Sequence, residues 1–386
     1  MLTGLGLTAG LSTAALPVSA QSFEQVDAAV REGIARHIYP GAVVVIGRRD
    51  SLLYARGYGH FTWKSSAPVP SPDSTLWDIA SITKVVGTAS AVMRLVDSGR
   101  LDLDAPVRRY LPRFSGGLKD QVTVRMLLNH TSGLRSYVPL FKRARTRASA
   151  LDVLYTEGPT RRPGDLPVYG DLNAIFLGLV VESVSKMPLE DFVAREVFDP
   201  LELRQTMYHP SAAARRRTVP TALWRGLPVQ GQVNDPNAAI LGGAAGHAGV
   251  FATGMDLARY AQVWLRGGIG PNGQWVRAAT LKRFLTKDTN SGPRLLGWDT
   301  PEVIKGEPSL YGTLISDAAY GHTGFTGTEL WIDPTNDLFL VFLTNRTFDP
   351  KGGDSAHRLR PIRTGLSDAA IRLVPHGCQQ ELVAGC

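Results

Sequence analysis

A serine and a lysine three residues apart are the first side chains in this sequence that could do chemistry together. Residues 81–84 read Ser-Ile-Thr-Lys, and positions i and i+3 of a helix lie on the same face. Lys84 could therefore stand beside the Ser81 hydroxyl and take its proton, which a serine must lose to become a good nucleophile. This S-x-x-K spacing indicates nucleophilic catalysis.

The S-x-x-K spacing occurs twice, so context has to separate the two copies. Residues 183–186 read Ser-Val-Ser-Lys. Ser81 opens an expected helix, at the positive end of the helix dipole, whereas Ser183 lies near a helix end, where the dipole disfavours an alkoxide. The alternative for Ser81 is an ordinary N-cap serine with Lys84 on the surface. Of the two copies, residues 81–84 are the better candidate.

Two motifs further along the chain could complete such a site. Tyr169 lies in the sequence Val-Tyr-Gly-Asp, and a phenol beside an ammonium group can have a lowered pKa and pass a proton to a leaving group. Residues 322–324 read His-Thr-Gly, with Gly321 and Gly327 nearby, and glycine lets a substrate backbone approach a strand edge closely. Taken alone, each motif is also typical of an ordinary turn.

The surrounding pattern predicts the elements that must hold these residues. Helical spacing predicts helices over residues 22–37, 81–98, 124–129, 172–186, 189–196, 256–265 and 354–374. Apolar runs predict strands over residues 42–46, 52–58, 329–333 and 338–343, with a hairpin turn at 49–50. We expect an α+β fold, in which an antiparallel sheet built from both ends of the chain is flanked by helices.

An inserted all-helical lobe interrupts this expected sheet. The predicted α/β lobe comprises residues 21–90 and 245–386, and the predicted helical lobe comprises residues 91–244. The catalytic cleft would lie between the two lobes.

Composition excludes several classes of protein. The 386 residues are 44% hydrophobic and 20% charged, a balance typical of soluble globular proteins. The net charge of +8 is scattered, apart from short basic runs at residues 142–147, 215–217 and 358–363, which favours solvated surface over nucleic-acid binding. Because no Cys/His cluster has zinc-ligand spacing, we expect neither a metal nor an organic cofactor.

The ends of the chain leave two questions open. Residues 1–20 carry no charge and end in Val-Ser-Ala, which is typical of a secretory cleavage site and predicts a periplasmic or secreted protein. The first basic residue is Arg31, so a flexible leader without an export role is the alternative. The stretch is too short, and contains too many Gly, Ser and Thr residues, to predict a stable membrane span. Cys378 and Cys386 either close a tail loop after export or remain free thiols.

Taken together, the motifs resemble those of the serine β-lactamase and penicillin-binding-protein superfamily. The order S-x-x-K, Tyr-x-Asp, His-Thr-Gly is most similar to class C β-lactamases and to the related esterases, D-alanyl-D-alanine carboxypeptidases and D-aminopeptidases. The resemblance runs from about Phe23 to about Thr347. It includes residues 40–43 (PGAV), 127–134 (LLNHTSGL), 246–251 (GHAGVF) and 321–325 (GHTGF).

This resemblance implies a role for each matching residue. Ser81 would form the acyl-enzyme, Lys84 would accept its proton and have a depressed pKa, and Tyr169 would protonate the leaving group. The backbone N–H groups of Ser81 and Phe325 would form the oxyanion hole. The substrate-binding residues would be Asp171, His322, Thr323 and Gly324.

Two residues depart from the class C pattern. His322 stands where class C enzymes carry lysine, so a titratable ring replaces a fixed cation, and Asp171 stands where they carry asparagine. Both changes favour the esterase and peptidase branches. We therefore expect hydrolysis of a small-molecule ester, a peptide-like amide or a peptidoglycan-type substrate. The alternatives are a true β-lactamase and a catalytically weak envelope or peptidoglycan-binding module with the same fold. The sequence leaves the oligomeric state open.

Overall fold

The computed structural model describes residues 20–301, 309–349 and 355–374. The predictions for the leader, of which only Ala20 is described, and for Cys378 and Cys386 lie outside these residues. They stay predictions.

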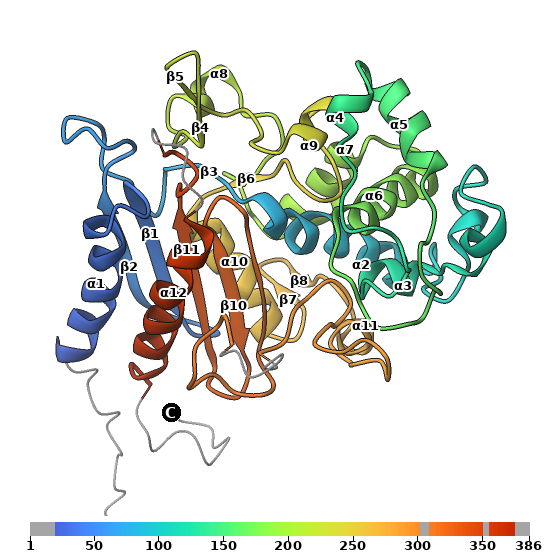
Figure 1. Ribbon diagram of the computed structural model, residues 1–386. Helices are drawn as coiled ribbons and strands as arrows, with labels where there is room; N and C mark the ends of the chain where they lie inside the picture. Colours follow the sequence, from blue (N-terminus) through green and yellow to red (C-terminus); the bar gives the residue numbers. More distant parts are fainter. Residues whose placement is uncertain (1–19, 302–308, 350–354, 375–386) are drawn as a thin grey trace, which may run out of the picture.

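A five-stranded antiparallel sheet joins segments from the two ends of the chain (Figure 1). Its strand order is β2-β1-β11-β10-β9. In the central pair, Val44 of β1 lies opposite Phe342 of β11, so the predicted pairing of the two β blocks is confirmed. The strands are β1 (Gly41–Gly47), β2 (Leu52–Gly59), β9 (Tyr320–Thr323), β10 (Glu329–Asp333) and β11 (Leu338–Thr344).

Helices cover both faces of this sheet, which explains why β1 is apolar throughout. Val43 and Val45 belong to a core cluster shared with α10 (Gly254–Leu265). Val44, on the opposite face, packs in a second cluster with α1 (Ala20–Ala35) and α12 (Ala356–Ile371). A strand buried on both faces has no polar side to alternate with the apolar one. Figure 1 shows α1 and α12 side by side on their face.

The insertion between the two β blocks is mainly helical, but it is not wholly helical as predicted. It contains a hairpin of two short strands, β4 (Ala222–Trp224) and β5 (Leu227–Val229). The positive φ angles of Arg225 and Gly226 allow the tight turn between them. The helical elements are η3 (Val107–Arg109), η4 (Gly117–Gln121), α3 (Val124–Leu128), α4 (Leu140–Arg143), α5 (Arg147–Thr156), α6 (Asp171–Ser185), α7 (Leu189–Val193), η5 (Ala194–Phe198), α8 (Ala212–Arg215) and α9 (Pro236–Ile240).

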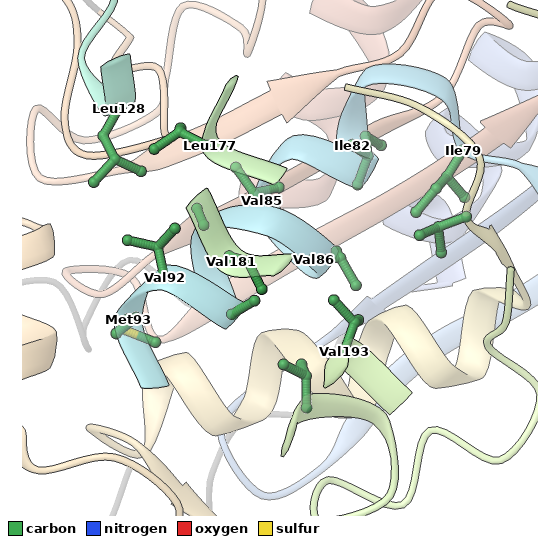
Figure 2. Close-up of a cluster of buried hydrophobic side chains, with 14 of the residues drawn as sticks. Ile79, Ile82, Val85, Val86, Val92, Met93, Leu128, Leu177, Val181 and Val193 are labelled. Carbon is green, nitrogen blue, oxygen red and sulfur yellow. The ribbon is translucent and has the colours of Figure 1, made fainter. Parts of the chain in front are cut away.

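The segment that carries Ser81 and Lys84 differs from the single helix predicted over residues 81–98. It consists of a 3₁₀ turn, a π-helical stretch and an α-helix in succession, namely η1 (Ala80–Ile82), η2 (Lys84–Ala89) and α2 (Ser90–Asp97). π-helical turns often occur at functional sites. Figure 2 shows side chains of this segment packed against Leu177 and Val181 of α6 and Val193 of α7. The segment therefore connects the sheet to the insertion.

The remaining elements are short, apart from α11. They are β3 (Trp77–Asp78), β6 (Phe251–Ala252), β7 (Ile269–Gly270), β8 (Gly273–Gln274) and α11 (Ala278–Phe284). β3 pairs with β6, and β7 pairs with β8. The predicted boundaries between the lobes, at residues 90/91 and 244/245, stay predictions.

Within the described ranges, no single helix is both long and apolar enough to cross a membrane. One pair of helical segments, Asp171–Ser185 with Leu189–Phe198, meets that criterion together, with a bend of 77° between them.

Candidate active site

Ser81 and Lys84 are in direct contact. The Lys84 ammonium donates a hydrogen bond of 2.8 Å from Nζ to Ser81 Oγ. Lys84 is buried, with 4% of its surface exposed, whereas Ser81 is partly exposed. The predicted neighbourhood of the two residues is confirmed, because the i, i+3 relation survives the change from an α-helix to a tighter turn.

Lys84 has an ionic partner that the sequence did not reveal. Its Nζ lies 2.8 Å from Oδ1 of Asp171, the first residue of α6, and also donates to the backbone oxygen of His247 at 3.3 Å. Asp171 was predicted to line the substrate side. The structure places Asp171 in the cavity wall and also brings its carboxylate into contact with the candidate proton acceptor.

The expected depressed pKa of Lys84 is wrong. Burial lowers the pKa of Lys84, but the charge interactions with Tyr169 and Asp171 outweigh burial and raise it above its ordinary value. Burial likewise raises the pKa of Asp171, and the Lys84 and His247 charges more than offset this and hold it below the ordinary value. The resting pair is therefore an ammonium and a carboxylate, with the ammonium donating to the serine hydroxyl.

Tyr169 lies beside this pair, at the entry to α6. Its ring centroid is 5.2 Å from Lys84 Nζ and 4.7 Å from Cζ of Arg294. The ring lies between the imidazoles of His130 and His322, with centroid separations of 4.9 and 5.7 Å. Two cations therefore lie close to the Tyr169 ring, and the electron-rich face of the phenol attracts both through cation–π contacts.

His130 supports the chain around Tyr169. Val168 N–H donates to the His130 backbone oxygen at 2.9 Å, and Gly170 N–H donates to its Nδ1 at 3.4 Å. Its ring is buried, and burial together with nearby cations lowers its pKa well below the ordinary value. His130 therefore holds the backbone on both sides of Tyr169 as a neutral ring.

His322 lies on the edge strand β9 as a buried, neutral ring. Burial lowers its pKa to about 4, although Asp299 opposes this effect. Its Nδ1 lies 2.8 Å from the Thr323 backbone oxygen, which can only accept, so Nδ1 carries the proton and Nε2 is left as an acceptor. Nε2 has no hydrogen-bond partner among the described residues. The sequence did not predict β9 as a strand.

The turn after β9 carries the remaining predicted residues. Gly324 N–H donates to the Thr328 backbone oxygen at 2.7 Å, and Gly327 N–H donates to the Gly324 oxygen at 3.0 Å. A Cβ on Gly324 would lie 2.0 Å from Thr328 Oγ1 and 2.5 Å from the Ile79 backbone oxygen, so only glycine fits there. Phe325, at the tip of the turn, is exposed, and Arg346 lies over its ring at 4.7 Å.

All the predicted site residues except Lys84 line one cavity of about 670 Å³. Lys84 lies directly behind the wall, beneath Ser81 and Asp171. This volume is within the usual range of small-molecule sites. The predicted site residues that line the cavity are Ser81, Tyr169, Asp171, His322, Thr323, Gly324 and Phe325.

Asp171 also belongs to the one group of side chains in the described part of the chain that could hold a metal. Candidate ligand atoms of Asp171, Asp235 and His247 lie within 4.8 Å of one another. However, Lys84 already neutralises Asp171, and Asp235 Oδ1 lies 2.8 Å from His247 Nε2. The Lys84 ammonium thus already supplies the positive charge that a metal ion would bring to Asp171. The expectation of no metal stays a prediction.

The second S-x-x-K copy is structural. Ser183 Oγ donates to the Tyr110 backbone oxygen at 2.7 Å, and Lys186 ends α6 with a positive φ of 61°. Ser81 contacts its lysine whereas Ser183 bonds to backbone, and the choice of residues 81–84 as the catalytic copy stays a prediction.

The family model described as Beta-lactamase matches residues 26–362. The chain belongs to this family. Its members are serine hydrolases, so the chain is a serine hydrolase of the β-lactamase and penicillin-binding-protein type.

Sequence relatives and a solved structure agree with this assignment. The chain is 30% identical over 366 residues to the N-acetylmuramyl-L-alanine amidase of Bacillus subtilis (strain 168), covering 86% of this chain and 82% of the relative. It is 29% identical over 346 residues to a protein of Escherichia coli (strain K12) named "Putative D-alanyl-D-alanine carboxypeptidase", covering 81% and 80%. A class C beta-lactamase superposes with a TM-score of 0.72 at 19% identity, over 95% of this chain and 98% of that one.

Among the cavity residues to which sequence reasoning assigned no role are Asp78, Asp235, His247 and Arg294. His247 lies in the motif at residues 246–251 that supported the family resemblance, so a signal existed for it. Asp78 lies three residues before Ser81. Arg294 follows the glycine and proline of a loop, and nothing in its sequence context indicated a site.

Proposed function

We propose that this protein hydrolyses an ester or peptide-like amide bond through an acyl-enzyme on Ser81. The observation that carries the proposal is the contact of 2.8 Å between Ser81 Oγ and the buried Lys84 Nζ in the wall of the cavity. A serine with an amine in contact has the partner that it needs to become a nucleophile.

The proposed chemistry follows from the charges around Ser81. At rest, Lys84 is an ammonium that donates to Ser81 Oγ, so it must first release a proton to solvent. The neutral amine then takes the Ser81 proton as Oγ attacks the substrate carbonyl. Tyr169 passes its proton to the leaving group and recovers one from Lys84, and water then hydrolyses the acyl-enzyme. We assign the oxyanion hole to the backbone N–H groups of Ser81 and Phe325, which line the same cavity.

His322 supports the choice of an ester or amide over a β-lactam. As a buried, neutral ring, it offers a substrate carboxylate no charge. A lysine at this position would do the opposite. Thr323 and Gly324, beside it on β9 and its turn, would align the substrate along the strand edge.

Peptidoglycan-type fragments are the proposed natural substrates. Two relatives support this choice, the N-acetylmuramyl-L-alanine amidase of B. subtilis and the E. coli protein named "Putative D-alanyl-D-alanine carboxypeptidase". Together with the small-x-small sequence at residues 18–20, they also support a location in the cell envelope, outside the cytoplasm.

A panel of substrates tests the proposal. Purified protein is assayed side by side on a short-chain p-nitrophenyl ester, a chromogenic cephalosporin and D-alanyl dipeptides. We expect turnover of the ester or the dipeptides that exceeds turnover of the cephalosporin. Ser81→Ala should abolish the activity, and the matched variant Ser183→Ala should retain it, because Ser183 bonds only to backbone.

Each other result of the panel has a definite reading. Retained turnover in Ser81→Ala rules out Ser81 as the nucleophile. A cephalosporin rate above all others indicates a true β-lactamase. Tight binding of peptidoglycan fragments without any turnover indicates a binding module.

A further inference from the structure

The residue directly before Ser81 has an unfavourable backbone conformation. Ala80 has a φ of +47°, in the left-handed region that L residues with a side chain rarely occupy. Such conformations persist only where the surroundings enforce them, and they are common at active sites. Ile79 and Ile82, on either side of Ala80 and Ser81, are anchored in the hydrophobic core (Figure 2).

The carboxylate of Asp78 holds this turn from two directions. Its Oδ1 accepts the N–H of Ala80 at 2.9 Å, and its Oδ2 accepts the N–H of Asn234 at 2.7 Å. Asp78 is 1% exposed. The first bond fixes the strained residue, and the second joins the Ser81 turn to the segment that leads into α9 and carries Asp235. Both segments line the cavity.

Backbone atoms of the same turn hold the other wall of the cavity. Thr326 Oγ1 donates to the Asp78 backbone oxygen at 2.7 Å, and Thr328 Oγ1 donates to the Ile79 oxygen at 3.0 Å. These two threonines lie in the turn that carries Phe325. The residues before Ser81 are thus the point at which three segments of the cavity wall meet.

Among the residues that the structure describes, no cation pairs with the buried Asp78 carboxylate. Burial raises the pKa of Asp78 to about 6, the N–H groups of Asn234 and Ala80 oppose this, and Asp235 is the charged residue that acts on it. Burying a carboxylate without a counter-ion costs free energy. The groups that this carboxylate binds are the two backbone N–H groups of Ala80 and Asn234. An N-cap or a packing residue at this position would not require a charge.

We propose that Asp78 is a positioning residue that holds Ala80 in its strained conformation and thereby fixes Ser81 and its backbone N–H for acylation. The inference rests on the proposed role of Ser81 as nucleophile. It adds a carboxylate whose two oxygens bond to backbone N–H groups and which acts on Ser81 through the backbone.

Attack of Ser81 on a fluorophosphonate, which phosphonylates the serine and releases fluoride, stands in for acylation and tests this proposal at pH 8, where Asp78 is ionised. The saturating phosphonylation rate constant, taken as the acylation rate, and the half-saturating probe concentration are measured for the wild type and for Asp78→Asn. The amide retains one acceptor but turns an N–H group toward one of the two backbone donors. We expect the rate constant to fall about tenfold or more, as for a lost hydrogen bond to a charged group, with little change in half-saturation.

A double variant separates positioning from a general loss of stability. Glycine adopts a positive φ freely, so Asp78→Asn combined with Ala80→Gly should regain much of the lost rate, with Ala80→Gly alone as its reference. The matched control is Asp256→Asn, a fully buried carboxylate at the start of α10 that also accepts a backbone N–H, from Gln205 at 2.7 Å. It should lower the melting temperature and leave the acylation rate of the folded protein intact.

Each outcome has a definite reading. An unchanged acylation rate in Asp78→Asn overturns the proposal, and so does a loss that Ala80→Gly does not relieve. If Asp78→Asn does not fold, Thr328→Val, which removes the bond to the Ile79 oxygen, is compared with and without Ala80→Gly under the same criteria. A wild-type protein that the probe does not label at Ser81 refutes the proposed function instead.

Discussion

At the scale of single residues, the sequence indicated the contact of Ser81 with Lys84 but not the charge state of the lysine. The contact follows from a spacing of three residues within one local segment. The charge state depends on Asp171, which is 87 residues away in the sequence and reaches Lys84 only because α6 packs against η2. Two contributions to the Lys84 pKa of opposite sign compete here, and their balance could not be predicted from the motif.

Asp171→Asn should move the pH dependence of kcat/KM. In the wild type the Tyr169 and Asp171 charges help to hold the proton on Lys84, so we expect activity to rise with pH as Lys84 deprotonates. Without the carboxylate, burial is less opposed and the pKa of Lys84 falls. We expect the midpoint of the rising limb to shift toward acid by about 1–3 pH units, the usual effect of one close opposite charge.

The control for this shift is Asp152→Asn, which removes an exposed carboxylate that pairs with Arg113 on the surface. Its profile should match the wild type. A rising limb that stays in place in Asp171→Asn would show that Asp171 does not govern the protonation of Lys84.

At the scale of elements, apolar strands and periodic helices were predictable, including the five-residue β10, whereas β9 and the turns around Ser81 were not. The run at residues 338–343 is apolar and buried throughout in β11, so its composition alone predicted a strand. β9 has only four residues, Tyr-Gly-His-Thr, and forms a strand because β10 offers it a partner edge. The 3₁₀ and π-helical turns around Ser81 and Lys84 likewise depend on tertiary contacts that a helical period does not encode.

The turn that contacts Lys84 depends on a close approach between elements. Gly246 packs against α6 so tightly that a Cβ would lie 1.9 Å from the Ala174 backbone oxygen. Gly246→Ala must therefore push residues 245–248 away from α6, including the His247 oxygen that accepts from Lys84. We expect a loss of about 1–3 kcal/mol in the free energy of unfolding and a clear fall in ester turnover.

Gly365→Ala on α12 is the matched control, since a Cβ there would meet nothing within 4 Å. Because alanine is the better helix former, this variant should gain about 0.5–1 kcal/mol in the free energy of unfolding. Chemical denaturation of both variants checks the pair. An equal response to the two substitutions would contradict the packing argument.

At the scale of the whole molecule, the sequence predicted that the two ends of the chain share one sheet. Strand-like runs at both ends, with helices between, have few other ways to bury their apolar faces. The positions of the boundaries between the two lobes were harder to predict from the sequence. One continuous core cluster contains Val43 of the sheet, Leu177 of α6 and Leu257 of α10, so the two lobes have no separate interiors that composition could mark.

This shared core predicts that the two lobes unfold together. Thermal unfolding followed by circular dichroism and by tryptophan fluorescence should give one transition with coincident midpoints. Two resolved transitions would show that the lobes are independent units and that the shared cluster does not couple them.

The central claim is that Ser81 forms a covalent acyl-enzyme, and mass spectrometry tests it most directly. The protein is mixed with a slowly released ester, quenched in acid, and digested for peptide mapping. We predict a mass increase equal to the acyl group on the peptide that contains Ser81, and no increase in the Ser81→Ala variant. An acyl group on another residue during turnover, or turnover without any adduct on Ser81 under conditions that trap one on a known acyl-enzyme, would contradict the account.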